Sequence, residues 1–121
     1  MDRAAFDRLV QEALSTIPEE FKHRLDNVEL LIADWPTSEQ LSRLGLPPGG
    51  TLFGLYQGVP QTRRGSRYGL VPPDTITLFR EPIVAAGHTY PGVAYIIRRT
   101  VLHEIAHHFG FDEEQLRELG Y

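Results

Sequence analysis

Two histidines and a glutamate near the C-terminal end of the sequence are the residues best suited to chemistry. His103, Glu104 and His107 form the pattern H-E-x-x-H, and Gly110 follows three residues after the second histidine. On a helix, residues four positions apart lie on the same face, so both imidazoles would project together. Two imidazoles at this spacing suit zinc, and the glutamate between them suits a general base acting on water. The pattern predicts a zinc-dependent hydrolase, with peptidase as the leading class.

A helix over about residues 92–109 is expected to position these side chains. His103 and His107 fall on one side of it, and four apolar residues fall roughly opposite: Ala94, Ile97, Val101 and Ile105. A helix that is apolar on most sides is a buried one, and buried histidines need a metal or hydrogen-bond partners. The alternative is a pair of structural histidines that bind no metal. His108 lies away from the His103–His107 face, so we expect it to serve in packing or in support of the site.

The bulk composition narrows the class of protein. At 121 residues, with 41% hydrophobic and 23% charged residues, we expect one domain over 1–121, as a monomer or small homo-oligomer. A formal net charge of −4 gives no electrostatic reason to expect nucleic acid as the main partner. The loop that contains Arg63, Arg64 and Arg67 is therefore expected to be solvated, and it receives no function.

Cysteine usage and hydropathy restrict the metal chemistry and the location. The sequence has no cysteine, so any zinc must be held by histidine and carboxylate side chains. We find no run of about 18 apolar residues and no segment shaped like a signal peptide. We therefore expect a cytoplasmic protein with no membrane partner.

The remaining periodicity predicts an α+β fold. Strands are expected over residues 27–33, 51–57 and 75–80, which are rich in apolar and β-branched side chains. Further helices are expected over about residues 3–15, from a Thr37–Gln40 capping box to Gly45, over 83–86 after Pro82, and after an Asp112–Gln115 capping box. We expect a small mixed sheet of about three strands, packed on the buried site helix and flanked by the other helices.

The motif and its glycine resemble one branch of the zincin metallopeptidases, written H-E-x-x-H-x-x-G-x-x-(H/D). Catalytic zinc usually takes three protein ligands and keeps one position for water. The resemblance implies that Gly110 lets the chain turn and brings the residue three positions later back to the metal. That residue is Glu113 rather than His or Asp, although Glu is chemically competent. Asp112 is the alternative third ligand, and the competing roles are a helix N-cap for Asp112 and a solvated first-turn acid for Glu113.

More broadly, the chain resembles the minimal, single-domain zincin-like proteins of bacteria, whose function is largely uncharacterised. Residues 51–57, 72–80 and 103–121 carry this resemblance, which spans most of the chain. It implies an edge strand above the site helix that aligns an extended peptide or unfolded protein segment, with residues 51–57 or 75–80 as candidates. It departs from metzincins because Met1 is the only methionine, so no Met-turn exists. Since only eleven residues follow Gly110, we expect Tyr121 to support the metal site instead.

The function expected from these residues is peptide-bond hydrolysis. Zinc held by His103, His107 and a third ligand would acidify a water molecule, and Glu104 would act as the general base. One alternative is a catalytically weak or inactive zincin scaffold that binds a metal or a peptide. A metal-dependent endoribonuclease of the H-x3-H-x5-H type is disfavoured, because it needs a histidine where this chain has Glu113.

Overall fold

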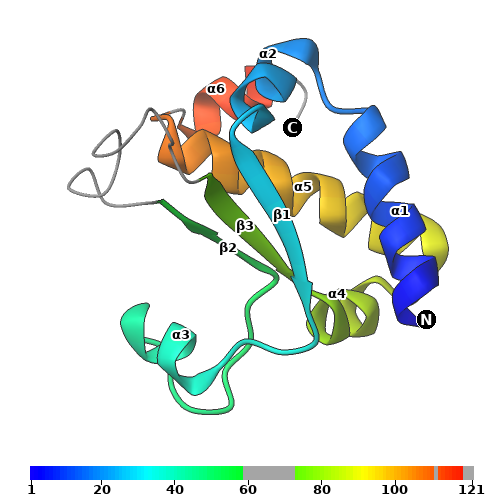
Figure 1. Ribbon diagram of the computed structural model, residues 1–121, viewed down its shortest axis with the longest axis vertical. Helices are drawn as coiled ribbons and strands as arrows, with labels where there is room; N and C mark the ends of the chain where they lie inside the picture. The colour runs from blue at the N-terminus through cyan, green and yellow to red at the C-terminus, as the bar shows by residue number, and fades with distance from the viewer. Residues whose placement is uncertain (59–72, 111, 119–121) are drawn as a thin grey trace, which may run out of the picture.

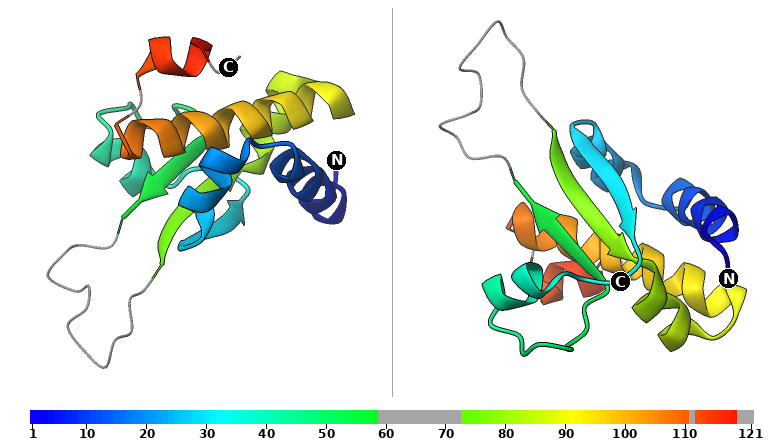
Figure 2. Two further views of the ribbon diagram at one scale, coloured as in Figure 1. Left: turned by 90° about the horizontal axis from the view of Figure 1, so that it is seen from above. Right: turned by 60° about the horizontal axis from the view of Figure 1, so that its bottom comes forward.

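The sequence folds into a small sheet with helices on one of its faces (Figures 1 and 2). The computed structural model describes residues 1–58, 73–110 and 112–118. Its strands are β1 (Val28–Ala33), β2 (Gly54–Gln57) and β3 (Asp74–Phe79). Its helices are α1 (Arg3–Ser15), α2 (Glu19–Lys22), the 3-10 helix η1 (His23–Leu25), α3 (Ser38–Arg43), α4 (Arg80–Gly87), α5 (Tyr90–His108) and α6 (Glu113–Glu118). The predicted α+β class and small mixed sheet are confirmed.

The sheet has the strand order β1-β3-β2. β3 pairs in parallel with β1 and antiparallel with β2, so it is the central strand. The proposal that residues 75–80 form the substrate-aligning edge is therefore wrong, because both edges of β3 are already hydrogen-bonded. β2 begins at Gly54 rather than at residue 51, since its partner β3 ends at Phe79, where the chain enters α4. The last ladder contact beyond β2 is the bond from the Phe79 N–H to the Phe53 carbonyl, at 2.9 Å.

Side chains alternate between the two faces of the sheet. On β1, Leu30 and Ile32 point toward the core, whereas Glu29 and Leu31 are exposed. On β3, Ile76 and Leu78 are fully buried in the same core cluster as the helices. This period of two is the pattern of an antiparallel or mixed sheet covered on one side. In Figure 2, α5 lies across the covered face and α1 lies beside it.

Helix α5 is the longest element and carries the H-E-x-x-H motif. Its N-terminus is capped by Thr89, whose hydroxyl accepts the Gly92 N–H at 3.1 Å. Its inner face consists of six fully buried residues: Val93, Ile97, Val101, Leu102, Ile105 and Ala106. Full burial of a Val, Leu or Ile side chain contributes about 1.5–3 kcal/mol, so this face fixes the rotation of the helix. The outer face is open, with Tyr95 52% exposed, so α5 is buried on one face rather than on most sides as predicted.

Gly54 allows β2 to pack against α5. A Cβ atom built on Gly54 would lie 2.6 Å from the Cγ2 atom of Thr100 and 3.2 Å from the carbonyl oxygen of Thr77. Real Cβ atoms essentially never approach another atom as closely as the first of these distances. The distance between the edge strand and the motif helix is therefore set by the absence of a side chain at residue 54.

Gly54→Ala is expected to lower the free energy of unfolding by about 1–3 kcal/mol, because the added methyl group overpacks the contact between β2 and α5. Urea unfolding of the variant and the wild type measures this change. The matched variant is Gly54→Ala with Thr100→Ser, which removes the clashing Cγ2 atom and keeps the hydroxyl. We expect it to recover part of the loss. Equal stability of Gly54→Ala and the wild type would show that β2 does not pack so closely on α5.

Candidate active site

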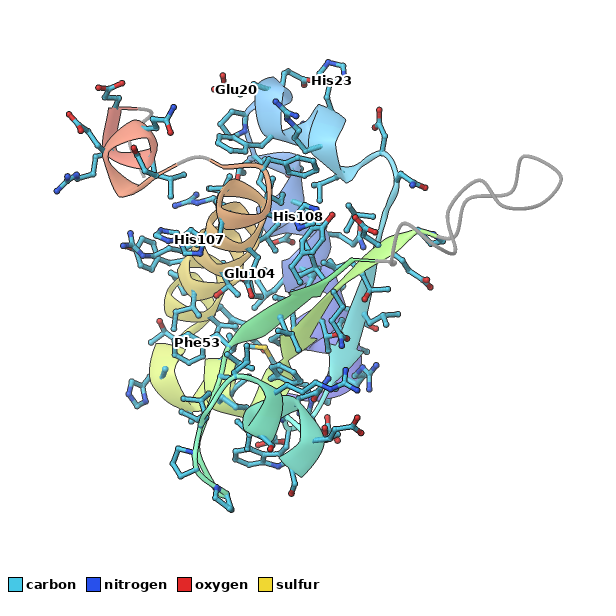
Figure 3. All side chains as sticks on the ribbon, turned by 90° about the vertical axis from the view of Figure 1, so that its left-hand side faces the viewer. Glu20, His23, Phe53, Glu104, His107 and His108 are labelled. Carbon is cyan, nitrogen blue, oxygen red and sulfur yellow. The ribbon has the colours of Figure 1, made fainter. Side chains whose placement is uncertain are left out.

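The last two turns of α5 bring the three motif residues together, as predicted. The ring centroids of His103 and His107 are 6.0 Å apart, with the rings nearly perpendicular. His103 and Glu104 are half-buried and His107 is exposed, so the motif faces an open side of the helix. Figure 3 shows Glu104, His107 and His108 on this part of α5, beside β2. This arrangement leaves room for a ligand to approach the motif.

The histidine pair fits a zinc ion by its chemistry and spacing. Zn–N bonds are about 2.0–2.1 Å long, so a single ion can bridge two imidazoles whose centres lie one helical turn apart. The Nε2 atom of His103 is buried and has no hydrogen-bond partner in the described part of the chain, although the residue makes other interactions. Within residues 1–58, 73–110 and 112–118, no group of three His, Asp or Glu side chains converges as a metal site. The described residues therefore bring together two candidate nitrogen donors, and no third candidate donor converges with them within these ranges.

Glu104 lies between the helix and the edge strand. Burial raises the pKa of its carboxyl group above the usual value, because the charged form loses solvation. A hydrogen bond from the backbone N–H of Tyr56 and the charge interaction with His107 act in the opposite direction and are weaker. The carboxylate thus accepts a hydrogen bond from the edge strand. A raised pKa makes it a stronger base than an exposed carboxylate.

The strand above the motif is β2, which lies at one edge of the sheet formed by the described residues. In an antiparallel ladder, alternate residues turn their N–H and C=O groups away from the partner strand. The bond between Phe79 and Phe53 sets this alternation, so the backbone groups of Gly54 and Tyr56 point outward. Of the two segments expected to align a peptide, only residues 51–57 reach an edge of the sheet, and only their second half is extended as a strand.

Two hollows flank Glu104 along this strand, and both are bounded by Leu52, Gly54 and Glu104. One has a volume of about 320 Å³ and runs toward the N-terminal half of α5, past Ile96 and Thr100. The other has a volume of about 450 Å³ and runs toward the end of α5, past His107 and His108.

The first hollow is lined mainly by carbon atoms. Its walls include Phe53, which is 37% exposed and lies ahead of β2 on the same side as the motif (Figure 3). The second hollow also contains Leu44, which is 48% exposed. Together the hollows make a groove between β2 and α5, with the Glu104 carboxylate near its middle.

The sequence was compared with models of known protein families. The model for zincin-like metallopeptidases matches residues 25–121. The chain belongs to this family. No curated protein matches the chain.

The matched region of this zincin-like chain includes every element around the groove, from β1 to α6. Helix α1 precedes it and packs on the buried face of α5 through Phe6, Leu9 and Val10. Every helix in the described ranges is too short or too polar to cross a membrane.

The turn after the motif follows the expected pattern. Phe109 caps α5, and Gly110 adopts a φ of +84°, a left-handed conformation that glycine adopts without strain. Asp112 acts as the N-cap of α6: its Oδ1 atom accepts the Gln115 N–H, and the Gln115 Oε1 atom accepts the Asp112 N–H, both at 2.8 Å. Asp112 therefore caps a helix in this zincin-like chain, which is the competing role that was predicted for it.

Two further residues were expected at the metal site: Glu113 as the third ligand and Tyr121 as support. Glu113 is the first residue of α6, but its side chain, Tyr121, Arg63, Arg64 and Arg67 lie outside the described residues. Their predicted roles stay predictions.

A polar and aromatic cluster that the sequence did not predict lies at the far end of the groove. It consists of Tyr56, Asp74, His108 and Phe109, and we call it the end cluster. The Tyr56 hydroxyl donates to Asp74 Oδ2 at 2.6 Å, and His108 Nε2 lies 3.7 Å from the same oxygen. The rings of Tyr56 and His108 stack at 3.9 Å. Asp74 comes directly before the strand expected over residues 75–80, and only the pairing of β2 with β3 brings it beside Tyr56.

Proposed function

We propose that this zincin-like chain is a zinc peptidase that cleaves short or unfolded peptide segments. The observation that carries the proposal is the position of Glu104. Its carboxylate is half-buried, has a raised pKa and lies beside two imidazoles at metal-binding spacing, in a groove with an open strand edge. His103 and His107 would hold the ion, and Glu113 is proposed as the third ligand.

When bound, zinc would acidify a water molecule and polarise the scissile carbonyl group. Glu104 would take the proton from this water, and the water oxygen would attack the carbonyl carbon. Glu104 would then deliver the proton to the leaving amine as the C–N bond breaks. The Tyr56 N–H would hold the Glu104 carboxylate in place during both transfers. Burial supports this role, because a base with a pKa nearer to neutral pH transfers protons in both directions more effectively.

The groove favours an extended peptide as the substrate. A peptide strand can pair with the outward backbone groups of Gly54, and the hollows on either side of Glu104 can take its side chains. Because the first hollow is apolar, we expect cleavage next to an apolar residue. The formal net charge of −4 does not favour an RNA substrate.

A second candidate is a peptide-binding scaffold without catalysis. It is favoured by the hydrogen bond between the Tyr56 N–H and Glu104, because this bond gives the glutamate a structural reason to be present.

Zinc analysis combined with peptide cleavage tests the proposed function. The purified protein is expected to contain one zinc per chain by mass spectrometry and to cleave members of an unstructured peptide library. EDTA should stop the cleavage, and added ZnCl₂ should restore it. Zinc binding without cleavage of any peptide would favour the scaffold. Absence of zinc after reconstitution would contradict both the peptidase and the metal site.

A further inference from the structure

The end cluster joins three parts of the chain at the far end of the groove. Tyr56 comes from the edge strand β2, Asp74 begins the central strand β3, and His108 ends helix α5. Phe109 packs edge-on against the rings of both Tyr56 and His108, with centroid distances of 6.5 and 4.9 Å. The cluster therefore holds the edge strand to the motif helix one residue after His107.

Asp74 holds this cluster together. It is only 7% exposed, and a buried carboxylate is costly unless hydrogen bonds compensate for lost water. The Tyr56 hydroxyl supplies one such bond at 2.6 Å, a length typical of strong O–H···O⁻ bonds. His108 Nε2, at 3.7 Å from the same oxygen, adds an attraction when the ring carries a proton. The side chain of Tyr56 is thus fixed at its hydroxyl by Asp74 and across its ring by His108.

Tyr56 also contacts the motif through its backbone. Its N–H donates to the Glu104 carboxylate, while its side chain extends into the end cluster. In a strand, the direction of a side chain is fixed relative to the N–H of the same residue, because both belong to one Cα centre with restricted dihedral angles. Fixing the Tyr56 ring therefore fixes the direction of the donor that holds Glu104.

We infer that Tyr56 and Asp74 are positioning residues for Glu104, with the Tyr56 side chain anchored on Asp74 and its backbone N–H orienting the glutamate. This inference rests on the proposed function only for its effect on catalysis. The contact itself is a property of the metal-free protein and can be measured without activity.

Tyr56→Phe tests the inference, because it removes the hydroxyl and keeps the stacked ring. We expect kcat for a cleaved peptide to fall by about 10- to 100-fold, since a displaced catalytic group costs up to about this factor. KM should change by less than about two-fold, because phenylalanine keeps the aromatic ring that Tyr56 contributes to the second hollow and only the positioning of Glu104 is lost. Zinc content should be unchanged. The matched control is Tyr95→Phe, which removes the same hydroxyl from an exposed tyrosine of α5 and should behave as the wild type.

Nuclear magnetic resonance of the metal-free protein gives the second readout. In Tyr56→Phe, the amide proton of residue 56 should shift upfield, toward its position in Glu104→Ala, because its bond to the carboxylate weakens. Asp74→Asn keeps an acceptor for the tyrosine hydroxyl, so it should retain more kcat and a smaller amide shift than Asp74→Ala. This pair also decides the question if Tyr56→Phe folds poorly.

The outcomes separate the two ideas. An unchanged kcat in Tyr56→Phe would overturn the positioning role. A lower kcat would also overturn it if the variant is less stable and the amide resonance of residue 56 does not shift. If zinc-loaded wild type cleaves no peptide, the proposed function fails, and the amide shift alone decides whether Tyr56 orients Glu104.

Discussion

Glu104→Gln is expected to reduce kcat for peptide cleavage by about 10²–10⁴-fold, the usual contribution of a general acid–base group. Glutamine has the same shape and can still accept the Tyr56 N–H, but it cannot take a proton from water. Zinc content should match the wild type, because the histidine pair is unchanged. Steady-state kinetics on a cleaved peptide, with metal analysis of the same samples, measures both effects. Full activity in this variant would remove Glu104 from the mechanism.

The same substitution is expected to stabilise the metal-free protein at neutral pH. Burial raises the pKa of Glu104 in the folded state above that in the unfolded chain. Stability from such a group is complete below the unfolded pKa and is lost as pH rises through the folded pKa. Glutamine does not titrate, so the variant avoids this loss. Urea unfolding should show Glu104→Gln as the more stable protein at pH 7, with the difference shrinking below about pH 4. A less stable variant at pH 7 would contradict the burial cost assigned to Glu104.

Substitution of either histidine of the proposed zinc site is expected to abolish zinc binding at micromolar zinc. Loss of residues that only support metal ligands weakens binding by about 10–100-fold, so loss of a direct ligand should exceed this. Bound zinc at about 100 times its Kd stabilises a protein by about 2.7 kcal/mol, which raises the melting temperature. We expect this rise in the wild type and not in His103→Ala or His107→Ala, by thermal unfolding with zinc and with EDTA. His23→Ala, which changes an exposed histidine of η1, is the control.

The third ligand can be identified with a pair of isosteric variants. Glu113→Gln should weaken zinc binding, because it removes the proposed carboxylate donor. Asp112→Asn should bind zinc as the wild type does, since asparagine is as good an N-cap as aspartate and preserves the start of α6. If Asp112→Asn alone loses affinity, Asp112 is the ligand and its capping bond must break when zinc binds.

Local patterns predicted most of the elements around the site. The motif helix, the glycine that ends it and the capping boxes at Thr37 and Asp112 depend on residues within a few positions of each other. Such features can be recognised in one stretch of sequence, because their hydrogen bonds close over three or four residues. The histidine pair with its glutamate belongs to this class.

Long-range pairing explains what the sequence could not predict. β3 is the central strand because both β1 and β2 pair with it. The residues of a single strand do not determine which other strands it pairs with. The same holds for the contact between Tyr56 and Asp74, which are 18 residues apart. The late start of β2 follows from the end of its partner at Phe79. Each of these features requires knowledge of the other strand.

The central position of β3 has a consequence for how this fold can change. β3 pairs with β2 along the groove and also carries Ile76 and Leu78 at the bottom of the core. Only one ladder of hydrogen bonds separates the surface that would meet a peptide from the side chains that hold the fold. In a larger enzyme, a binding loop can change without affecting a distant core. In a small domain with a three-stranded sheet, a change in the groove also affects the packing of the core and the stability of the fold. Adaptation of this groove to a new peptide should therefore require compensating changes in the core.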